Sequence, residues 1–248
     1  MSLKGKVAVL TGGGSGMGQA TCVRLARDGA AIAVWDVNEK GARETVDMIA
    51  KEGGKAIAVQ VDVSSKESVG TATARTRTEL GPITILVNNA GISGNVPFLE
   101  VTEEYWDRMM AINLKGPFYC TQAIVPDMIA AKWGRIVNVT SSSTQVGASK
   151  MSAYVSSKGG LVGFTKALAV EFARDGITTN SVPPNFIDTP MLREHCDEEF
   201  ISSRAKTSVM GCPGSVWDIA AAIGYLCSVE AKHINGHALS VNGGNYMN

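Results

Sequence analysis

Two residues, Tyr154 and Lys158, have the types and the spacing that proton transfer needs. They lie four positions apart in a stretch that we expect to be helical, so their side chains share one face. A free phenol titrates near pH ~10 and is a poor base at neutral pH. An ammonium about 5 Å away, at an effective dielectric of about 20, would lower the pKa of the phenol by about two units. The phenol could then take a proton from an alcohol as hydride leaves the carbon, although such a pair can also be an exposed surface pair.

A run of hydroxyl side chains over residues 140–144 offers a second catalytic group. A hydroxyl here could orient a substrate oxygen and stabilise the charge that develops on it. Ser141 is the candidate, and Ser142 is the alternative. Ser143 or Gln145 could instead face the substrate.

Asn113 interrupts an apolar stretch that otherwise reads as helix. Asparagine is a poor residue for a helix interior because its side chain competes for backbone hydrogen bonds. Either the residue has a function there, or it is a satisfied core asparagine at a bend.

A glycine-rich turn directly follows the first expected strand and reads TGGGSGMG over residues 11–18. Missing side chains let the backbone approach a pyrophosphate, and free N–H groups at a helix start hold the anion. Its position between a strand and a helix makes this turn a candidate dinucleotide site. The candidate contacts are Gly12, Ser15, Gly16, Met17 and Gly18.

Asp36 stands at the end of the second expected strand. A carboxylate there can accept hydrogen bonds from both ribose hydroxyls and would repel a 2′-phosphate. Its neighbours Val37 and Asn38 supply no cation, so we expect NAD rather than NADP. Asp62 and Val63, after the third expected strand, could hydrogen-bond and pack an adenine ring.

Short apolar runs alternate with longer amphipathic stretches along the whole chain, which predicts an α/β fold. We expect a single Rossmann-type domain over residues 1–248, a doubly wound parallel sheet of about seven strands with helices on both faces. The expected strands are residues 7–10, 31–35, 56–61, 83–87, 135–139, 177–182 and 238–241. The expected helices are near residues 16–29, 39–53, 65–80, 102–131, 152–175 and 215–228. Residues 188–214 lack a convincing strand, and we interpret them as a substrate lid, with an ordinary helical insertion as the alternative.

Composition excludes several classes of protein. The 248 residues carry 23 basic and 23 acidic side chains, which gives no electrostatic reason to expect nucleic acid or an anionic membrane as partner. Five scattered cysteines without a C-x-x-C motif argue against a disulfide framework and favour a reducing cytoplasm. We find no apolar run long enough for a signal peptide or a membrane span. No metal site is expected, because His233 and His237 have no third ligand nearby.

Together these motifs resemble the short-chain dehydrogenase/reductase family, in its NAD-preferring, single-domain form. The resemblance rests on the glycine-rich turn, residues 88–91 (NNAG), Asn113, Ser141 and the Tyr154-x-x-x-Lys158 pair, in family order and spacing. It implies that Tyr154 is the acid/base and that Lys158 tunes it. It selects Ser141 over Ser142 for the substrate oxygen, and it implies that Asn113 holds a water linking Lys158 to solvent.

The resemblance also implies contacts from two further segments. Asn89 would contact the adenine-side ribose, and Ile187 and Thr189 would contact the nicotinamide carboxamide. Pro184 departs from the family pattern, because it occupies a place usually held by glycine. Residues 234–236 and 241–244 match the C-terminal signature associated with subunit contacts, which implies a homo-oligomer, a homotetramer or a dimer.

These observations lead us to expect a soluble, NAD(H)-dependent oxidoreductase that interconverts a secondary alcohol and a ketone. We expect a small, fairly apolar substrate, alicyclic, steroidal or acyl-thioester. The candidate substrate contacts are Ser143, Phe98, Val146, Phe186 and Met191, with Leu192 beside them.

Two alternatives remain open. A 3-oxoacyl-[acyl-carrier-protein] reductase usually prefers NADPH and has basic residues near its active-site mouth. Lys132 and Arg135 could be such residues, but Asp175 falls where another cation is expected, and Asp36 opposes NADPH. The alternative from another class is a non-catalytic dinucleotide-binding sensor, which would have no need of a tuned phenol.

Overall fold

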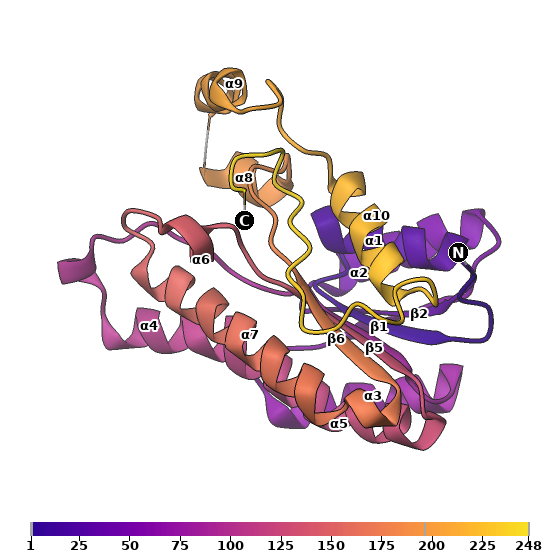
Figure 1. Ribbon diagram of the computed structural model, residues 1–248. Helices are drawn as coiled ribbons and strands as arrows, with labels where there is room; N and C mark the ends of the chain where they lie inside the picture. Colours follow the sequence, from indigo (N-terminus) through magenta and orange to yellow (C-terminus); the bar gives the residue numbers. More distant parts are fainter. Residues whose placement is uncertain (1, 196, 248) are drawn as a thin grey trace.

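The computed structural model describes residues 2–195 and 197–247, and these form a six-stranded parallel sheet covered by helices on both faces (Figure 1). The strand order is β3-β2-β1-β4-β5-β6, and every neighbouring pair is parallel. The strands are β1 (Val7–Thr11), β2 (Ala31–Asp36), β3 (Ala56–Gln60), β4 (Ile85–Asn88), β5 (Gly134–Val139) and β6 (Ile177–Val182). All residues of β1, β4, β5 and β6 are buried, as expected for strands with helices on both sides. The predicted Rossmann-type α/β architecture is therefore confirmed.

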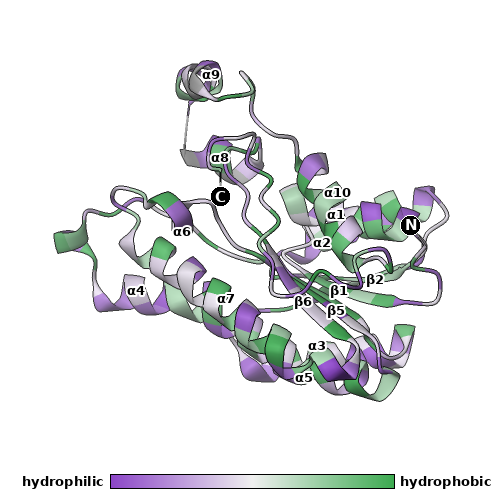
Figure 2. Cartoon of the chain, viewed as in Figure 1, coloured by the Kyte–Doolittle hydropathy of each residue, from purple (hydrophilic) through white to green (hydrophobic). Residues whose placement is uncertain are grey.

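Two sets of helices cover the two faces, and each has its own apolar core. The first set is α1 (Gly16–Arg27), α2 (Glu39–Lys51) and α10 (Val216–Cys227). The second set is α3 (Lys66–Leu80), α5 (Gly116–Ala131) and α7 (Ser152–Glu171), with α4 (Glu103–Met110) packed against α7. Hydrophobic and hydrophilic residues are interspersed along α7, whereas α10 is mostly hydrophobic (Figure 2). The remaining short elements are η1 (Phe98–Glu100), α6 (Ser143–Val146) and η3 (Ala173–Asp175).

Several helix starts follow the expected capping pattern. Ser65 accepts a hydrogen bond from the Ser68 N–H at the start of α3, and Thr102 accepts one from the Tyr105 N–H at the start of α4. The long helix expected over residues 102–131 is not continuous. A π-helical segment, η2 (Ala111–Lys115), separates α4 from α5 and contains Asn113.

The seventh strand, expected at residues 238–241, does not form a regular ladder. That segment runs beside β6, where the Ser181 N–H donates to the His237 carbonyl and the Leu239 N–H donates to the Ser181 carbonyl, both at 2.9 Å. The next donor on the β6 side would be Pro183, which has no N–H. Only isolated bridges remain, Ser181 to Ala238 and Pro184 to Val241.

Lys132 and Arg135, considered above as cations near the active-site mouth, lie at the amino end of β5. The carboxyl ends of the strands, where ligands bind in such sheets, are at the opposite edge. Arg135 is buried and donates to the carbonyls of Ser228 and Gly134, at 3.2 and 2.7 Å. Lys132 pairs with Asp175 at 2.6 Å. That part of the carrier-protein interpretation is therefore wrong for this chain.

The segment expected to be a lid contains two short helices, α8 (Pro190–His195) and α9 (Glu198–Thr207). They stand at the carboxyl edge of the sheet, at the top of Figure 1. Arg193 ties the segment together, because its guanidinium binds the Asp188 carboxylate at 2.8 and 2.9 Å and Glu198 at 2.9 Å. Cys196 lies outside the described residues. Among the helices that are described, none has the length and apolar character needed to cross a bilayer.

Candidate active site

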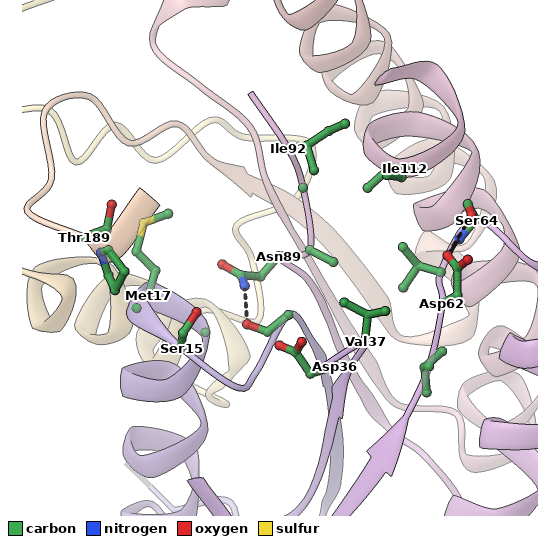
Figure 3. Close-up of a pocket in the computed structure, with 18 of the residues that line it drawn as sticks. Ser15, Met17, Asp36, Val37, Asp62, Ser64, Asn89, Ile92, Ile112 and Thr189 are labelled. Atoms are coloured by element: carbon green, nitrogen blue, oxygen red, sulfur yellow. Dashed lines mark hydrogen bonds between the residues drawn. The ribbon is translucent and has the colours of Figure 1, made fainter. Parts of the chain in front are cut away.

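A cavity of about 650 Å³ opens at the carboxyl edge of the sheet, where the strand order reverses between β1 and β4 (Figure 3). Such a topological switch point is the usual ligand site of an open α/β sheet. In the close-up, Asp36, Val37 and Asp62 lie along one part of the cavity, and Met17 and Thr189 lie along another. The lining includes ten of the predicted cofactor contacts, Gly12, Ser15, Gly16, Met17, Gly18, Asp36, Asp62, Val63, Asn89 and Thr189.

Hydrogen bonds of Thr11 and Asn89 join the glycine-rich turn to the segment that follows β4. The Asn89 side-chain amide donates to the carbonyls of Thr11 and Gly12, both at 3.0 Å. The Thr11 hydroxyl accepts from the backbone N–H groups of Asn89 and Ala90, also at 3.0 Å. A methyl group on Gly18 would collide with the Gly12 carbonyl oxygen, so only glycine fits there. Because both amide hydrogens of Asn89 are used on the turn, only its oxygen is left for the expected contact with a ribose.

The Asp36 carboxylate is fixed at the edge of the cavity by two backbone donors. The Gly14 N–H donates to one oxygen and the Asn38 N–H donates to the other, both at 2.8 Å. Asp62 is held in a similar way, since the Ser64 N–H and hydroxyl donate to one of its oxygens at 2.9 and 2.6 Å. Both carboxylates keep lone pairs that can accept ribose or adenine hydrogens.

Ser141, rather than Ser142, is the hydroxyl beside Tyr154. Burial raises the pKa of the Tyr154 phenol, and its hydrogen bond with the Ser141 hydroxyl offsets part of that rise. The Ser141 and Ser143 hydroxyl oxygens are 2.8 Å apart. Ser142 points elsewhere, because its hydroxyl donates to the Asn185 side chain at 3.0 Å.

Lys158 is buried, and its ammonium donates to the Val139 carbonyl at 2.8 Å. The nitrogen lies 6.0 Å from the centre of the Tyr154 ring. Burial lowers the pKa of Lys158 to about 8, because charge is costly away from water. The expected acidification of Tyr154 is not found in the protein alone, since desolvation raises the pKa of the phenol and the Ser141 hydrogen bond offsets only part of that rise.

Asn113 is buried in the π-helical segment, and its side chain is satisfied by protein groups. Its oxygen accepts from the Ile92 N–H, and its nitrogen donates to the Ile92 carbonyl, both at 2.9 Å. The nitrogen also lies 3.1 Å from the Ser157 hydroxyl. A Cβ on Gly91 would lie 3.1 Å from the Asn113 oxygen and 3.3 Å from the Lys158 nitrogen, so the missing side chain brings these residues together. The water relay expected from the resemblance stays a prediction.

The other expected contacts are more scattered. Ile187 is buried in the apolar core rather than in the cavity lining. Phe98 and Val146 are 70% and 66% exposed, and Phe186 is only partly buried. Met191 lies in α8, but its side chain is outside the part that the structure describes.

Several lining residues were not predicted. They are Val37, Val61, Ser64, Ala90, Gly91, Ile92, Arg108, Ala111, Ile112 and Pro190. The lining residues that adjoin a predicted contact could have been found from the sequence, because they follow a strand. Arg108, Ala111 and Ile112 could not, because they face the cavity only through the packing of α4 and η2. Among the described residues, no cluster of three or more His, Cys, Asp or Glu side chains could hold a metal ion.

Comparisons with known proteins agree with this geometry. The family model described as short chain dehydrogenase matches residues 6–199. The (2S)-[(R)-hydroxy(phenyl)methyl]succinyl-CoA dehydrogenase subunit BbsD of Thauera aromatica is 39% identical, over 98% of both chains. The 3-oxoacyl-[acyl-carrier-protein] reductase FabG of Vibrio cholerae is 37% identical, over 100% of both chains. Cyclohexanol dehydrogenase of an Acinetobacter strain is 36% identical, over 96% of this chain and 94% of that one.

A crystal structure from Sinorhizobium meliloti, provisionally assigned as a short-chain alcohol dehydrogenase, shares the fold. It has a TM-score of 0.93 and 37% identity, and the match covers 98% of this chain and 97% of that one.

The lowered pKa of the buried Lys158 ammonium leads to a prediction that can be tested without a ligand. Between pH 7 and pH 9.5 the folded protein should release the Lys158 proton while the unfolded chain keeps it, so wild-type stability should rise relative to Lys158→Met. With a folded pKa of about 8, the rise should be about 2 kcal/mol. Urea unfolding at the two pH values measures it, and Lys166→Met, at an exposed position on the same helix, is the matched control. A stability difference between wild type and Lys158→Met that is the same at both pH values would refute the shifted pKa.

Proposed function

The chain belongs to the short-chain dehydrogenase family, whose members are oxidoreductases, and we propose that it is an NAD(H)-dependent enzyme interconverting a secondary alcohol and a ketone. The observation that carries the proposal is the arrangement of Tyr154, Ser141 and Lys158, whose ammonium lies next to Gly91, a residue of the cavity lining. A non-catalytic sensor is disfavoured, because a protein that only binds a dinucleotide has no use for a buried phenol next to a buried ammonium.

The cavity fits a dinucleotide. Its floor is the glycine turn, in which a Cβ on Gly14 would come within 2.9 Å of an Asp36 carboxylate oxygen and one on Gly18 would strike the Gly12 carbonyl. The backbone N–H groups at the start of α1 would bind the pyrophosphate, and Asp36 would accept the ribose hydroxyls. When bound, the nicotinamide would accept or supply the hydride.

The chain's own residues would handle the proton. Tyr154 takes the alcohol proton during oxidation and returns it to the ketone oxygen during reduction. Ser141 donates a hydrogen bond to the same oxygen and stabilises its partial charge. Lys158 supplies positive charge near the phenol, which adds to the charge of an oxidised nicotinamide in lowering the pKa of Tyr154. Asn113, at the π-helical segment, supports proton exchange between Lys158 and solvent.

The preference for NAD rests on Asp36. Its fixed carboxylate would repel the 2′-phosphate of NADP, and the only cation among the described lining residues is Arg108, on the α4 wall. We further propose that the enzyme works as a homotetramer or dimer in the cytoplasm. Large apolar side chains exposed on α5 and α7, such as Phe118 and Val170, support an oligomer, and unpaired buried cysteines suit a reducing compartment.

The substrate is proposed to be fairly apolar, either an alicyclic or steroidal alcohol or a hydroxyacyl thioester. The relatives named above act on substrates of the thioester and alicyclic kinds. A 3-oxoacyl-carrier-protein reductase is the second candidate, favoured by the match to FabG over the full length of both chains. The position of Lys132 and Arg135 at the wrong end of the sheet removes one argument for it.

Asp36→Ala should reduce the preference of the protein for NADH over NADPH. In fluorescence titrations wild type should bind NADH at least about tenfold more tightly than NADPH, and the variant should lose most of that ratio because the repelling carboxylate is gone. Asp107→Ala removes a carboxylate from an exposed position on α4 and should leave the ratio unchanged. Equal affinities of the wild type for NADH and NADPH would refute the role of Asp36.

Tyr154→Phe should lower kcat by about a thousandfold, because the proton has no acceptor, while the Kd for NADH stays within about threefold. Single-turnover absorbance at 340 nm and fluorescence titration measure the two quantities. Tyr119→Phe, on α5, is the matched control and should keep full activity. An active Tyr154→Phe variant would end the proton-transfer role.

A panel of alcohols assayed with NAD should separate the substrate classes. We expect cyclohexanol, a hydroxysteroid or a 3-hydroxyacyl-CoA to be oxidised with the highest kcat/KM, and a polyol such as sorbitol to be poor. A polyol oxidised far better than the others would rule out the apolar substrate. Preference for an acyl-carrier-protein thioester with NADPH would support the second candidate.

A further inference from the structure

Two neighbouring residues of β5, Val139 and Asn138, form hydrogen bonds with helix α7 at two points along the helix axis, and the position of α7 along this axis is called its height on β5. The Val139 carbonyl accepts the hydrogen bond from the Lys158 ammonium at 2.8 Å. The side-chain amide of Asn138 donates to the Thr165 hydroxyl at 2.9 Å. Lys158 and Thr165 lie seven residues apart on α7, about two helical turns, so they project from the same face. Leu161, between them, is buried on that face as well.

Asn138 is the centre of a buried chain of polar groups. Its side-chain oxygen accepts from the Asn88 amide at the end of β4, at 2.8 Å, and its side-chain nitrogen donates to the Thr165 hydroxyl. The Thr165 hydroxyl hydrogen is already used on the Leu161 carbonyl at 2.8 Å, so this hydroxyl can only accept from Asn138. Asn88, Asn138 and Thr165 are at most 2% exposed. Each bond is therefore costly to break, because water cannot replace the missing partner.

Directional bonds and apolar contacts constrain a helix differently. Apolar side chains against a sheet resist separation but tolerate a small slide along the helix axis, whereas a hydrogen bond weakens steeply once donor and acceptor leave alignment. Other hydrogen bonds reach α7 from Asn113 and Asn235, but the bond between Asn138 and Thr165 ties α7 to β5 independently of Lys158. A shift of α7 would move the ammonium away from the Val139 carbonyl and change its place beside Tyr154.

We propose that Asn138 is a positioning residue: by fixing Thr165, it sets the height of α7 on β5 and so holds the Lys158 ammonium at the Val139 carbonyl beside Tyr154. Its importance for catalysis rests on the proposed function, but its effect on Lys158 does not.

The surroundings of the ammonium make the consequence measurable. The groups placed near it are the Val139 carbonyl from β5, the Gly91 backbone after β4 and the Asn113 amide from η2, all uncharged. Tyr154, on its own helix, is the titratable neighbour. Burial accounts for the lowered pKa of Lys158, with no charged group of the described residues among its causes. If α7 slides and water enters, this pKa should rise toward that of a solvated lysine.

The test compares two threonines with the same chemistry. Thr165→Val removes the acceptor for Asn138. Thr76→Val is the matched control on α3, because the Thr76 hydroxyl also donates to its own helix, to the Ala72 carbonyl, and accepts from a strand side chain, the Trp35 indole, at 3.1 Å. Both variants should lose a similar amount of stability, about 5 °C in Tm, since each leaves one buried N–H unpaired. Thr165→Ser, which keeps the hydroxyl, should behave as wild type, and Thr165→Ala replaces the valine variant if that fails to fold.

Only Thr165→Val should change the titration of the site. The apparent pKa in the pH profile of kcat for alcohol oxidation should rise by about 0.5 unit or more, because a displaced ammonium acidifies Tyr154 less. Thr76→Val and Thr165→Ser should keep the wild-type profile. An unchanged profile in Thr165→Val, or an equal shift in Thr76→Val, would overturn the proposal.

A second measurement needs no substrate or cofactor. The contribution of Lys158 to the pH dependence of unfolding is the difference between wild type and Lys158→Met, and the same difference is measured in the Thr165→Val background. We expect the valine background to reduce it by at least half. A contribution equal to that in wild type would refute the positioning role. Because this cycle is independent of turnover, it decides the role of Asn138 even if the protein oxidises no alcohol and the proposed function fails.

Discussion

A single buried positive charge constrains how this site is built. Lys158 is 4% exposed, so its ammonium has lost most of its hydration. The hydrogen bond to the Val139 carbonyl offsets only part of the free energy that this desolvation costs. The cost that remains is seen in the pKa of Lys158, which desolvation lowers to about 8. Gly91 has no side chain, so the ammonium and the Asn113 amide can approach each other. In the proposed function Tyr154 depends on this arrangement, which a displacement of α7 would disturb.

The cofactor side of the cavity is built by a different constraint, the close approach of backbone to backbone. The turn after β1 lies so near to the segment after β4 that the Asn89 amide can close it from below. On the other side of β1, the Gly14 N–H of the turn donates to the Asp36 carboxylate at the end of β2. The turn, the Asp36 carboxylate and the segment after β4 are therefore joined by hydrogen bonds. A dinucleotide would meet a site that is already organised, which reduces the entropy lost on binding.

Buried polar side chains connect the two halves of the sheet. Asn88 precedes the residue that closes the glycine turn, and its amide donates to Asn138, which in turn holds α7. The glycine-rich turn and helix α7 are thus linked through the centre of the sheet by amides with almost no exposure. At the amino edge, Arg135 has a different role: it donates to the carbonyl of Ser228, the residue that ends α10, and to those of Gly134 and Gly176. The candidate site lies at the carboxyl edge of the sheet, and the contacts of Arg135 at the amino edge stabilise the fold.

The sequence by itself determined the order of strands and helices, the glycine turn, the placement of Asp36 and the shared face of Tyr154 and Lys158, because these depend on local spacing along the chain. It could not reveal the π-helical segment around Asn113, or that Pro183 would interrupt a seventh strand, since both depend on partners distant in sequence. It also predicted a lowered pKa for Tyr154, whereas desolvation in the fold raises that pKa. Desolvation and hydrogen-bond partners exist only once the elements have packed, so the spacing of residues along the chain could not predict them.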